Sequence, residues 1–278
     1  MPSLETLQFG FDNLRLISPP NHVEPLQLPL LQELVIDVSP ASVTRPFLSN
    51  SSFRGLRNGS FECSFGEGSD LDEHSITIGV VFPLITEGNF GCLNRLVIGD
   101  SSLTLSKLSN PPEIWENQHA IAFHAIDYYR PSAIGTTREL MKVLGALPSN
   151  PTTQIVHLSV AVDLTSEQFV ELFGHLPQLE SICGDGISCQ HIIESLKIPP
   201  QHPLDIPIPF SKVNTIRFFG QRHADECSPE LLEELCHCLT ERYMYGAVVS
   251  KLLLYWDLTR EEVQQLQEFV ADVECRKL

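Results

Sequence analysis

The sequence contains few basic residues and no long apolar run. Only 18 of its 278 residues are lysine or arginine, against 35 aspartates and glutamates, which gives a formal net charge of −17. Nucleic-acid binding needs clustered cations that replace the counterions of phosphate, so this composition argues against a nucleic-acid partner. No segment approaches the ~18 consecutive apolar residues of a membrane-spanning helix, so we expect no membrane partner either.

Signals of secretion and of a disulfide framework are also missing. The first residues, MPSLETLQFGF, lack the basic start and continuous apolar core of a signal peptide. The eight cysteines are irregularly spaced, which favours reduced thiols in a long chain. We therefore predict an intracellular protein, cytoplasmic or nuclear.

Motifs of catalysis, cofactor binding and metal binding are absent as well. The sequence holds no G-x-S-x-G, H-E-x-x-H or G-x-x-x-x-G-K-[ST] motif. Five potential zinc ligands cluster near residue 230, but without a C-x-x-C pair, and buried apolar thiols are the expected outcome. They are His223, Cys227, Cys236, His237 and Cys238. We expect no enzyme, no cofactor and no metal, with an enzyme of unrecognised type as an alternative.

One apolar pattern recurs along the chain. LLQELVID (30–37) places Leu31, Leu34 and Ile36 in an apolar-x-x-apolar-x-apolar unit. In a strand the last two side chains share a face, and the first enters from the preceding turn. Further copies are LETLQF (4–9), LNRLVI (93–98), IVHLSV (155–160), VNTIRF (213–218), VSKLLL (249–254) and LESICG (179–184), whose last apolar position is a glycine.

The spacing of the copies predicts stacked supersecondary units. Between the middle positions 7, 34, 96, 158, 182, 216 and 252 the intervals are 27, 62, 62, 24, 34 and 36 residues. Because 62 is twice 31, we predict a degenerate unit in each long gap. These hidden units are SFECSF (60–65) and AIAFHAI (120–126).

Amphipathic helices are predicted in the second half. Four segments combine helix-entry residues with an apolar face. They are 136–147 with Thr136 and Glu139, 165–176 with Thr165 and Gln168, 228–243 with Ser228 and Pro229, and 259–273 with Thr259 and Glu262. Residues 39–90 and 100–135 are less regular, and we expect long loops or short helical turns there.

Alternating strands and helices predict an α/β fold with a parallel sheet and right-handed crossovers. No domain boundary is evident, so we predict one domain, 1–278, with irregular repeats over 1–135 and regular strand–helix repeats over 136–278. The expected form is a curved solenoid, with the parallel β-sheet on the concave side and helices and loops on the convex side.

The chain resembles the leucine-rich-repeat region of F-box proteins of mushroom-forming fungi. The likeness is carried by LPLLQELVI (28–36), LPQLESICG (176–184) and the block 249–274, which in such proteins closes the solenoid with a strand, here 249–255, and a final helix, here 260–275. The resemblance implies substrate recognition for a cullin-type ubiquitin ligase. Met1 begins inside a repeat, so we expect adaptor binding only if a missing F-box is restored; a free-standing scaffold and a truncated product are alternatives.

Outward positions of the strands form the predicted binding surface for a protein partner. Arginine, tyrosine and tryptophan are favoured interface anchors, and apolar residues at outward positions add to the prediction. The alternative is that a helix or loop covers this face. The predicted surface comprises Glu33, Val35, Arg95, Val97, His157, Ser159, Thr215, Arg217, Lys251, Leu253, Tyr255 and Trp256.

Overall fold

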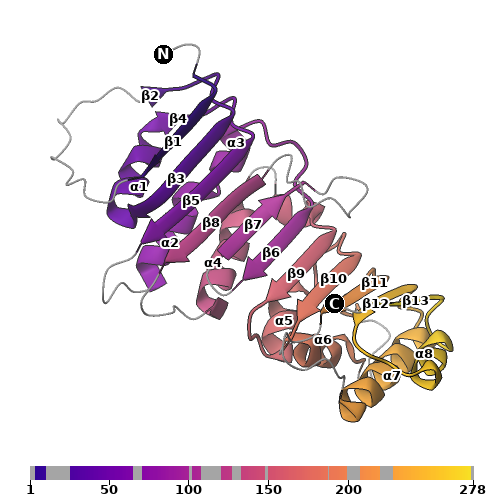
Figure 1. Cartoon of the computed structure of the whole chain (residues 1–278). Coiled ribbons are helices and arrows are strands. Elements are labelled where there is room, and N and C mark those ends of the chain that lie inside the picture. Colours follow the sequence, from indigo (N-terminus) through magenta and orange to yellow (C-terminus); the bar gives the residue numbers. More distant parts are fainter. Residues whose placement is uncertain are drawn as a thin grey trace. The chain divides into compact units, whose positions relative to one another are not determined.

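The chain forms a mixed α/β fold that divides into two compact units, residues 1–154 and 155–278, here called the N-terminal and C-terminal units (Figure 1). No helix among the described residues has the length and apolar character needed to cross a membrane. The single domain expected over 1–278 stays a prediction. The computed structural model describes residues 4–10, 26–64, 71–99, 102–107, 120–126, 133–147, 150–186, 188–198, 207–219 and 228–276.

Six strands of the N-terminal unit form a mostly parallel array in the order β1-β3-β5-β8-β7-β6, and helices cover one face of it (Figure 1). Strands β2 and β4 pair separately, in parallel. The described elements are β1 (Thr6–Gly10), β2 (Leu26–Gln27), β3 (Glu33–Pro40), α1 (Ala41–Ser49), β4 (Ser51–Ser52), β5 (Asn58–Ser64), α2 (Leu71–Val81), α3 (Leu84–Glu87), β6 (Arg95–Gly99), β7 (Ser102–Ser106), β8 (Ala120–Ile126), α4 (Ala133–Ala146) and the 3₁₀ helix η1 (Pro151–Gln154).

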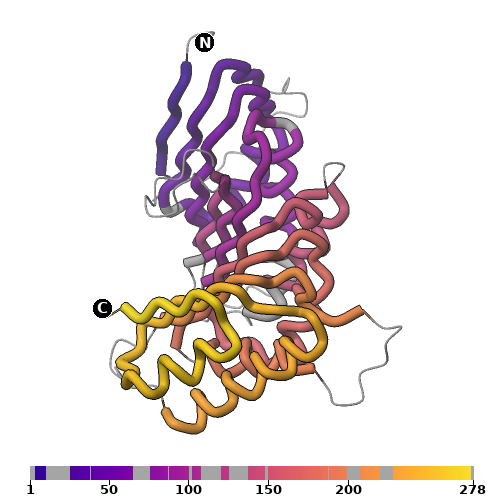
Figure 2. Tube along the Cα trace, turned by 90° about the vertical axis from the view of Figure 1, so that its right-hand side faces the viewer, coloured from indigo at the N-terminus to yellow at the C-terminus, as the bar shows by residue number. Residues whose placement is uncertain are grey.

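The five strands of the C-terminal unit are all parallel and follow one another in chain order, β9 to β13 (Figure 2). Helix α6 packs against β10 and lies between α5 and α7. The described elements are β9 (His157–Ala161), α5 (Ser166–Phe173), β10 (Ser181–Asp185), α6 (Ser188–Leu196), β11 (Thr215–Phe219), α7 (Pro229–Met244), β12 (Lys251–Tyr255), α8 (Arg260–Gln267) and β13 (Asp272–Cys275).

The predicted apolar units supply the buried face of the strands. Leu31, Leu34 and Ile36 are all 0% exposed, and the same three positions around β6, β9, β11 and β12 are at most 2% exposed. Removing such side chains from water is the main driving force for folding. The two hidden units are confirmed as strands: β5 and β8 lie in the predicted gaps and run parallel to each other.

Backbone hydrogen bonds repeat at the strand entries of both units. A carbonyl just before one strand accepts two N–H groups that lead into the next strand, which links neighbouring segments before their ladders begin. The carbonyl of Glu180, for example, accepts from Asn214 N–H at 2.9 Å and from Thr215 N–H at 3.1 Å. The carbonyls bonded in this way are those of Glu5, Gln32, Val156, Glu180 and Asn214.

Strand β7 corrects the expectation of an entirely parallel sheet. It runs antiparallel to both β6 and β8, and the chain returns through it to place β8 beside β5. Two successive antiparallel pairings leave β6 and β8 pointing the same way, so the predicted strands keep a common direction. Alternation of Leu103 and Leu105 with polar residues was the signal for this missed strand.

Several helix predictions also need correction. Helix α4 begins at Ala133, so Thr136 lies inside it and does not cap it. The last helix ends at Gln267, and Val273 belongs to strand β13. Helices α1 and α2 lie where loops or short turns were expected, and α6 was not predicted. The entry residues of the other three predicted helices are confirmed as N-caps: Thr165 with Gln168, Ser228, and Thr259 with Glu262.

A buried arginine joins three segments of the C-terminal unit. Arg242 on α7 is 0% exposed; its Nη1 donates to the Leu196 carbonyl at the end of α6 (3.2 Å), and its Nη2 donates to the Phe210 carbonyl (2.6 Å). Phe210 has a φ of 56°, a strained conformation for a residue with a side chain. Burial lowers the pKa of Arg242. Through its two hydrogen bonds, the buried guanidinium links α7 to the end of α6 and to the turn at Phe210.

Candidate interaction surface

Alternate residues of the C-terminal strands point away from the helices, and the strand register aligns them in rows. Inward positions are buried, whereas most outward positions keep part of their surface exposed. The first row contains His157, Ser181, Thr215, Lys251 and Asp272, the second Ser159, Cys183, Arg217, Leu253 and Glu274, and the third Asp185, Phe219 and Tyr255.

An aromatic pair and a leucine form the apolar centre of this face. Phe219 and Tyr255 lie opposite each other on β11 and β12, with their rings stacked at 4.5 Å and an interplanar angle of 29°. Leu253 is only 6% exposed although it is on the outward face, and its register neighbours are Arg217 and Glu274. We call Arg217, Phe219, Leu253 and Tyr255 the outward patch.

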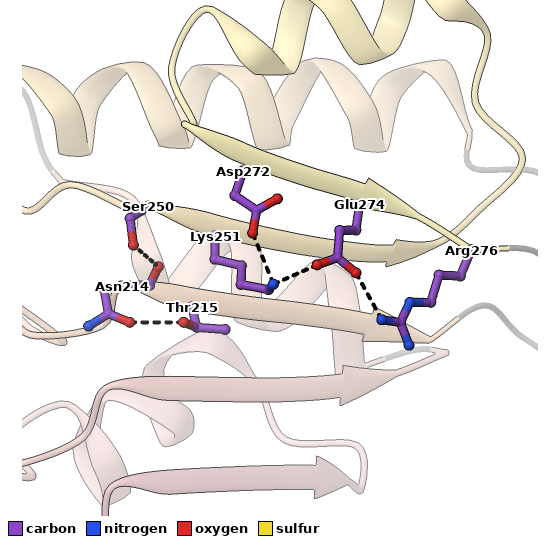
Figure 3. Close-up of polar contacts among 7 residues, drawn as sticks. All are labelled: Asn214, Thr215, Ser250, Lys251, Asp272, Glu274 and Arg276. Atoms are coloured by element: carbon purple, nitrogen blue, oxygen red, sulfur yellow. Dashed lines mark hydrogen bonds and ion pairs between the residues drawn. The ribbon is translucent and has the colours of Figure 1, made fainter. Parts of the chain in front are cut away.

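Four charged residues form an ionic rim beside the outward patch (Figure 3). The Nζ of Lys251 donates to Glu274 at 2.6 Å and lies 2.9 Å from an oxygen of Asp272. The other Glu274 oxygen accepts from Arg276 Nη2 at 2.9 Å. The hydrogen bond from Lys251 lowers the pKa of Glu274, and the bond to Glu274 raises the pKa of Lys251 and of Arg276. These four charges therefore largely satisfy one another.

Polar side chains at the entries of β11 and β12 form hydrogen bonds near the ionic rim (Figure 3). The Thr215 hydroxyl donates to Asn214 Oδ1 at 2.9 Å, and the Ser250 hydroxyl donates to the Asn214 carbonyl at 3.2 Å. Thr215, one of the predicted surface residues, is thus already hydrogen-bonded within its own strand entry. Its contribution to binding a partner would be smaller than that of the outward patch.

Arg217 differs from the cations of the rim. Within the described part of the chain its guanidinium has no ion pair or hydrogen bond, and its Nε is buried without an acceptor. Buried N–H donors nearly always find a partner in folded proteins. Arg217 is therefore the group on this face whose hydrogen-bonding capacity is least satisfied.

The structure brings together only part of the predicted surface. Arg217, Leu253 and Tyr255 meet in the outward patch, and Lys251 lies at its rim. Trp256 is 6% exposed and stacks on Phe218, a residue of the helix-covered face, at 5.5 Å. The tryptophan therefore does not belong to the outward patch. His157 and Ser159 lie on β9, two strands before β11 in the sheet.

Four predicted residues lie in the N-terminal unit: Glu33 and Val35 on β3, and Arg95 and Val97 on β6. The residues aligned between Val35 and Val97 are small, namely Ser60, Ala122 and Thr104. The two valines are thus separated by three strands and do not form one apolar cluster.

Four residues of the outward patch and the ionic rim were missed by the sequence prediction: Phe219, Asp272, Glu274 and Arg276. Phe219 continues the alternation of Thr215 and Arg217, so the strand period could have revealed it. Glu274 could not be found in this way because its segment was predicted to be helical.

The possible zinc cluster is only partly described, since His223 and Cys227 lie outside the described residues. Cys236 and Cys238 are buried, and burial raises the pKa of the Cys238 thiol to about 12. A thiol with a raised pKa stays protonated and binds metals poorly. Within the described ranges, no three histidine, cysteine or acidic side chains are placed to hold a metal ion.

Comparison with known proteins gives no match: no family model, curated protein or solved structure proves similar to this chain. The resemblance to F-box leucine-rich-repeat regions stays a prediction.

Proposed function

We propose that the chain is a protein-binding module and that the outward patch of the C-terminal unit contacts the partner. The observation that carries the proposal is the stacked Phe219–Tyr255 pair beside Leu253 and Arg217, on the sheet face opposite the helices. Aromatic residues and arginine are enriched at the centres of protein interfaces, while lysine and glutamate are more common at the rim. The outward patch and the ionic rim follow that division.

In this proposal the C-terminal unit is a leucine-rich-repeat-like solenoid with its strands on the binding side. Its strands begin at residues 157, 181, 215, 251 and 272, so successive starts are 24, 34, 36 and 21 residues apart. Consecutive strand order, the repeated entry carbonyls and the buried apolar triplets support stacked units in which each segment contacts its neighbours.

On the resemblance to F-box leucine-rich-repeat regions, we further propose that this binding selects substrates for a cullin-type ubiquitin ligase. An F-box would then contact the adaptor, and the outward patch would contact the substrate. We expect the 278-residue chain alone to fail in a pull-down with purified adaptor and the same chain fused behind an F-box to succeed. Tight binding of the adaptor by the chain alone would overturn this division of roles.

The outward patch itself can be tested with a random-peptide phage library selected on the purified chain. We expect the enriched peptides to bind a Phe219→Ala/Tyr255→Ala variant about tenfold or more weakly, since two interface anchors are lost. The matched control is Val35→Ala/Val97→Ala, which truncates two outward side chains of the N-terminal unit. The variants are compared only if their melting curves show that both are folded. Peptides that bind all three proteins equally would contradict the proposal.

A further inference from the structure

The cations around the outward patch differ in how many ion pairs and hydrogen bonds they make. Lys251 is held by Asp272 and Glu274, and Arg276 is held by the second oxygen of Glu274. Arg217 has no acceptor among the described residues, and its Nε is buried. The carboxylates of the ionic rim are already engaged, so they are poorly suited to pair with Arg217.

The surroundings of Arg217 suit a planar acceptor next to an apolar side chain. The register places Cys183 on one side of Arg217 and Leu253 on the other, with Phe219 two residues along the same face of β11. A guanidinium presents donors in a fixed fork that matches both oxygens of a carboxylate. The stacked rings of Phe219 and Tyr255 are partly exposed and offer apolar surface within two residues of that fork, and Leu253 lies buried beside it.

We propose that Arg217 binds a carboxylate of the protein partner, specifically the side chain of an aspartate or glutamate that is followed or preceded by an apolar residue. The apolar neighbour packs on the partly exposed Phe219–Tyr255 pair. This inference rests on the proposed function and adds the chemistry of the partner to it. The partner segment crosses the outward patch with its acidic residue over β11.

The sheet favours a side-chain carboxylate over the carboxyl terminus of a chain. Terminal carboxylates are captured by free backbone amides, whereas β11 is paired on both sides, with β10 and with β12. The net charge of −17 further disfavours a long acidic run in the partner. A single acidic residue within an apolar stretch fits both observations.

A double-mutant cycle on peptides from the phage selection tests the inference. In peptides selected on the wild-type chain, we expect one Asp or Glu beside an aromatic or aliphatic residue. Replacing that Glu by Gln should weaken binding to the wild type about tenfold or more, but should weaken binding to Arg217→Gln less than about twofold. Arg217→Lys keeps the charge but loses the fork, so it should retain only part of the preference.

The outcomes separate the two proposals. Peptides that depend on Phe219 and Tyr255 but bind equally well with Glu or Gln would overturn the role of Arg217 and leave the outward patch as the binding site. Peptides that bind the Phe219→Ala/Tyr255→Ala variant as tightly as the wild type would overturn the proposed function itself. Melting curves of the Arg217 variants exclude unfolding as the cause, because a substitution on a partly exposed strand position should leave the buried face intact.

Discussion

The N-terminal and C-terminal units share their strand-entry chemistry but differ in the order of their strands. In both, a carbonyl before one strand accepts two N–H groups of the next segment, as Glu5 does in the first unit and Glu180 in the second. In the N-terminal unit, however, the β6–β7 hairpin carries the chain out and β8 returns to pair with β5. The apolar triplet therefore determines that a strand forms, while the connection after it determines where the next strand lies.

The outward faces of the two units differ as much as their strand orders. Between Val35 and Val97 the N-terminal unit aligns only Ser60, Ala122 and Thr104. The corresponding row of the C-terminal unit includes the longer side chains of Arg217, Leu253 and Glu274, and the rings of Phe219 and Tyr255 stack in the next row. Small polar side chains offer little area for a partner, so the comparison concentrates the expected binding energy in the C-terminal unit.

Among the variants that test this comparison, Arg242→Met is expected to have the largest effect on stability. The substitution leaves the Leu196, Pro209 and Phe210 carbonyls without their buried donor and removes support from the strained Phe210 backbone. We expect the free energy of unfolding to fall by about 3 kcal/mol or more. Urea denaturation followed by far-ultraviolet circular dichroism measures the loss.

The control for this prediction is Arg45→Met in the N-terminal unit. Arg45 is half-buried on α1, and its Nε donates to the Ala41 carbonyl of the same helix at 3.2 Å. Its loss should cost about 1 kcal/mol or less, because the helix remains packed without it. Equal losses in the two variants would show that Arg242 is not a special link in the C-terminal unit.

A smaller loss of stability is expected from Gly184→Ala. The two units differ in which side chain packs against a glycine of a strand. A Cβ at Gly184 would collide with Cδ1 of Ile192 on α6, whereas at Gly59 of β5 it would meet the ring of Phe61 in the same strand. We expect Gly184→Ala to cost about 1–3 kcal/mol through overpacking. Urea denaturation again provides the measurement.

Ile192→Val removes the colliding atom and should restore part of the stability lost in Gly184→Ala. The double variant would then be more stable than the sum of the two single losses predicts, which a double-mutant cycle detects. Gly145→Ala on the open surface of α4 is the control and should be neutral or slightly stabilising. A strictly additive cycle would mean that α6 does not occupy the space left by the glycine.

The strands could be predicted from sequence where their apolar residues face a covered side, as in β3 and β12. Helix α1 escaped prediction because it has Pro46 in its interior and no side-chain N-cap. At α4 the Thr136/Glu139 spacing resembled a capping box, but the helix starts three residues earlier. Local patterns therefore identified strands better than they identified helix starts.

The candidate site was predictable only where it depends on strand alternation. Arg217, Leu253 and Tyr255 follow the period of two that places outward residues, and the same period places Trp256 with Leu252 and Leu254 on the covered face. The contacts of Glu274 with Lys251 and Arg276 depend on the pairing of β13 with β12. That pairing is a tertiary contact between segments, and no local pattern in the sequence indicates it.

The smallest expected effect concerns the end strands of the two units, β13 and β1. At β13, Lys251 and Arg276 lower the pKa of Glu274 below its usual value of 4.5. Its carboxylate therefore stabilises the fold above that value and loses this contribution as the pH falls through the lowered pKa. Lys251 has a raised pKa, so its contribution persists below pH 10.5 and is lost as the pH rises through the raised value.

Glu274→Gln should reduce the amide-exchange protection of β13 at pH 7 by less than about 1 kcal/mol, since the pair is partly exposed. Below the lowered pKa of Glu274 the wild type and the variant should converge when compared at the same pH. Strand β1 pairs in parallel with β3, and a side-chain hydrogen bond of 2.8 Å joins Gln8 to Asp37. Glu274 contributes to neither contact, so the protection of β1 should not change. Glu268→Gln, at the exposed end of α8, controls for the loss of one negative charge. A difference between wild type and Glu274→Gln that persists unchanged in acid would show that packing, and not the ionic rim, holds β13 in place.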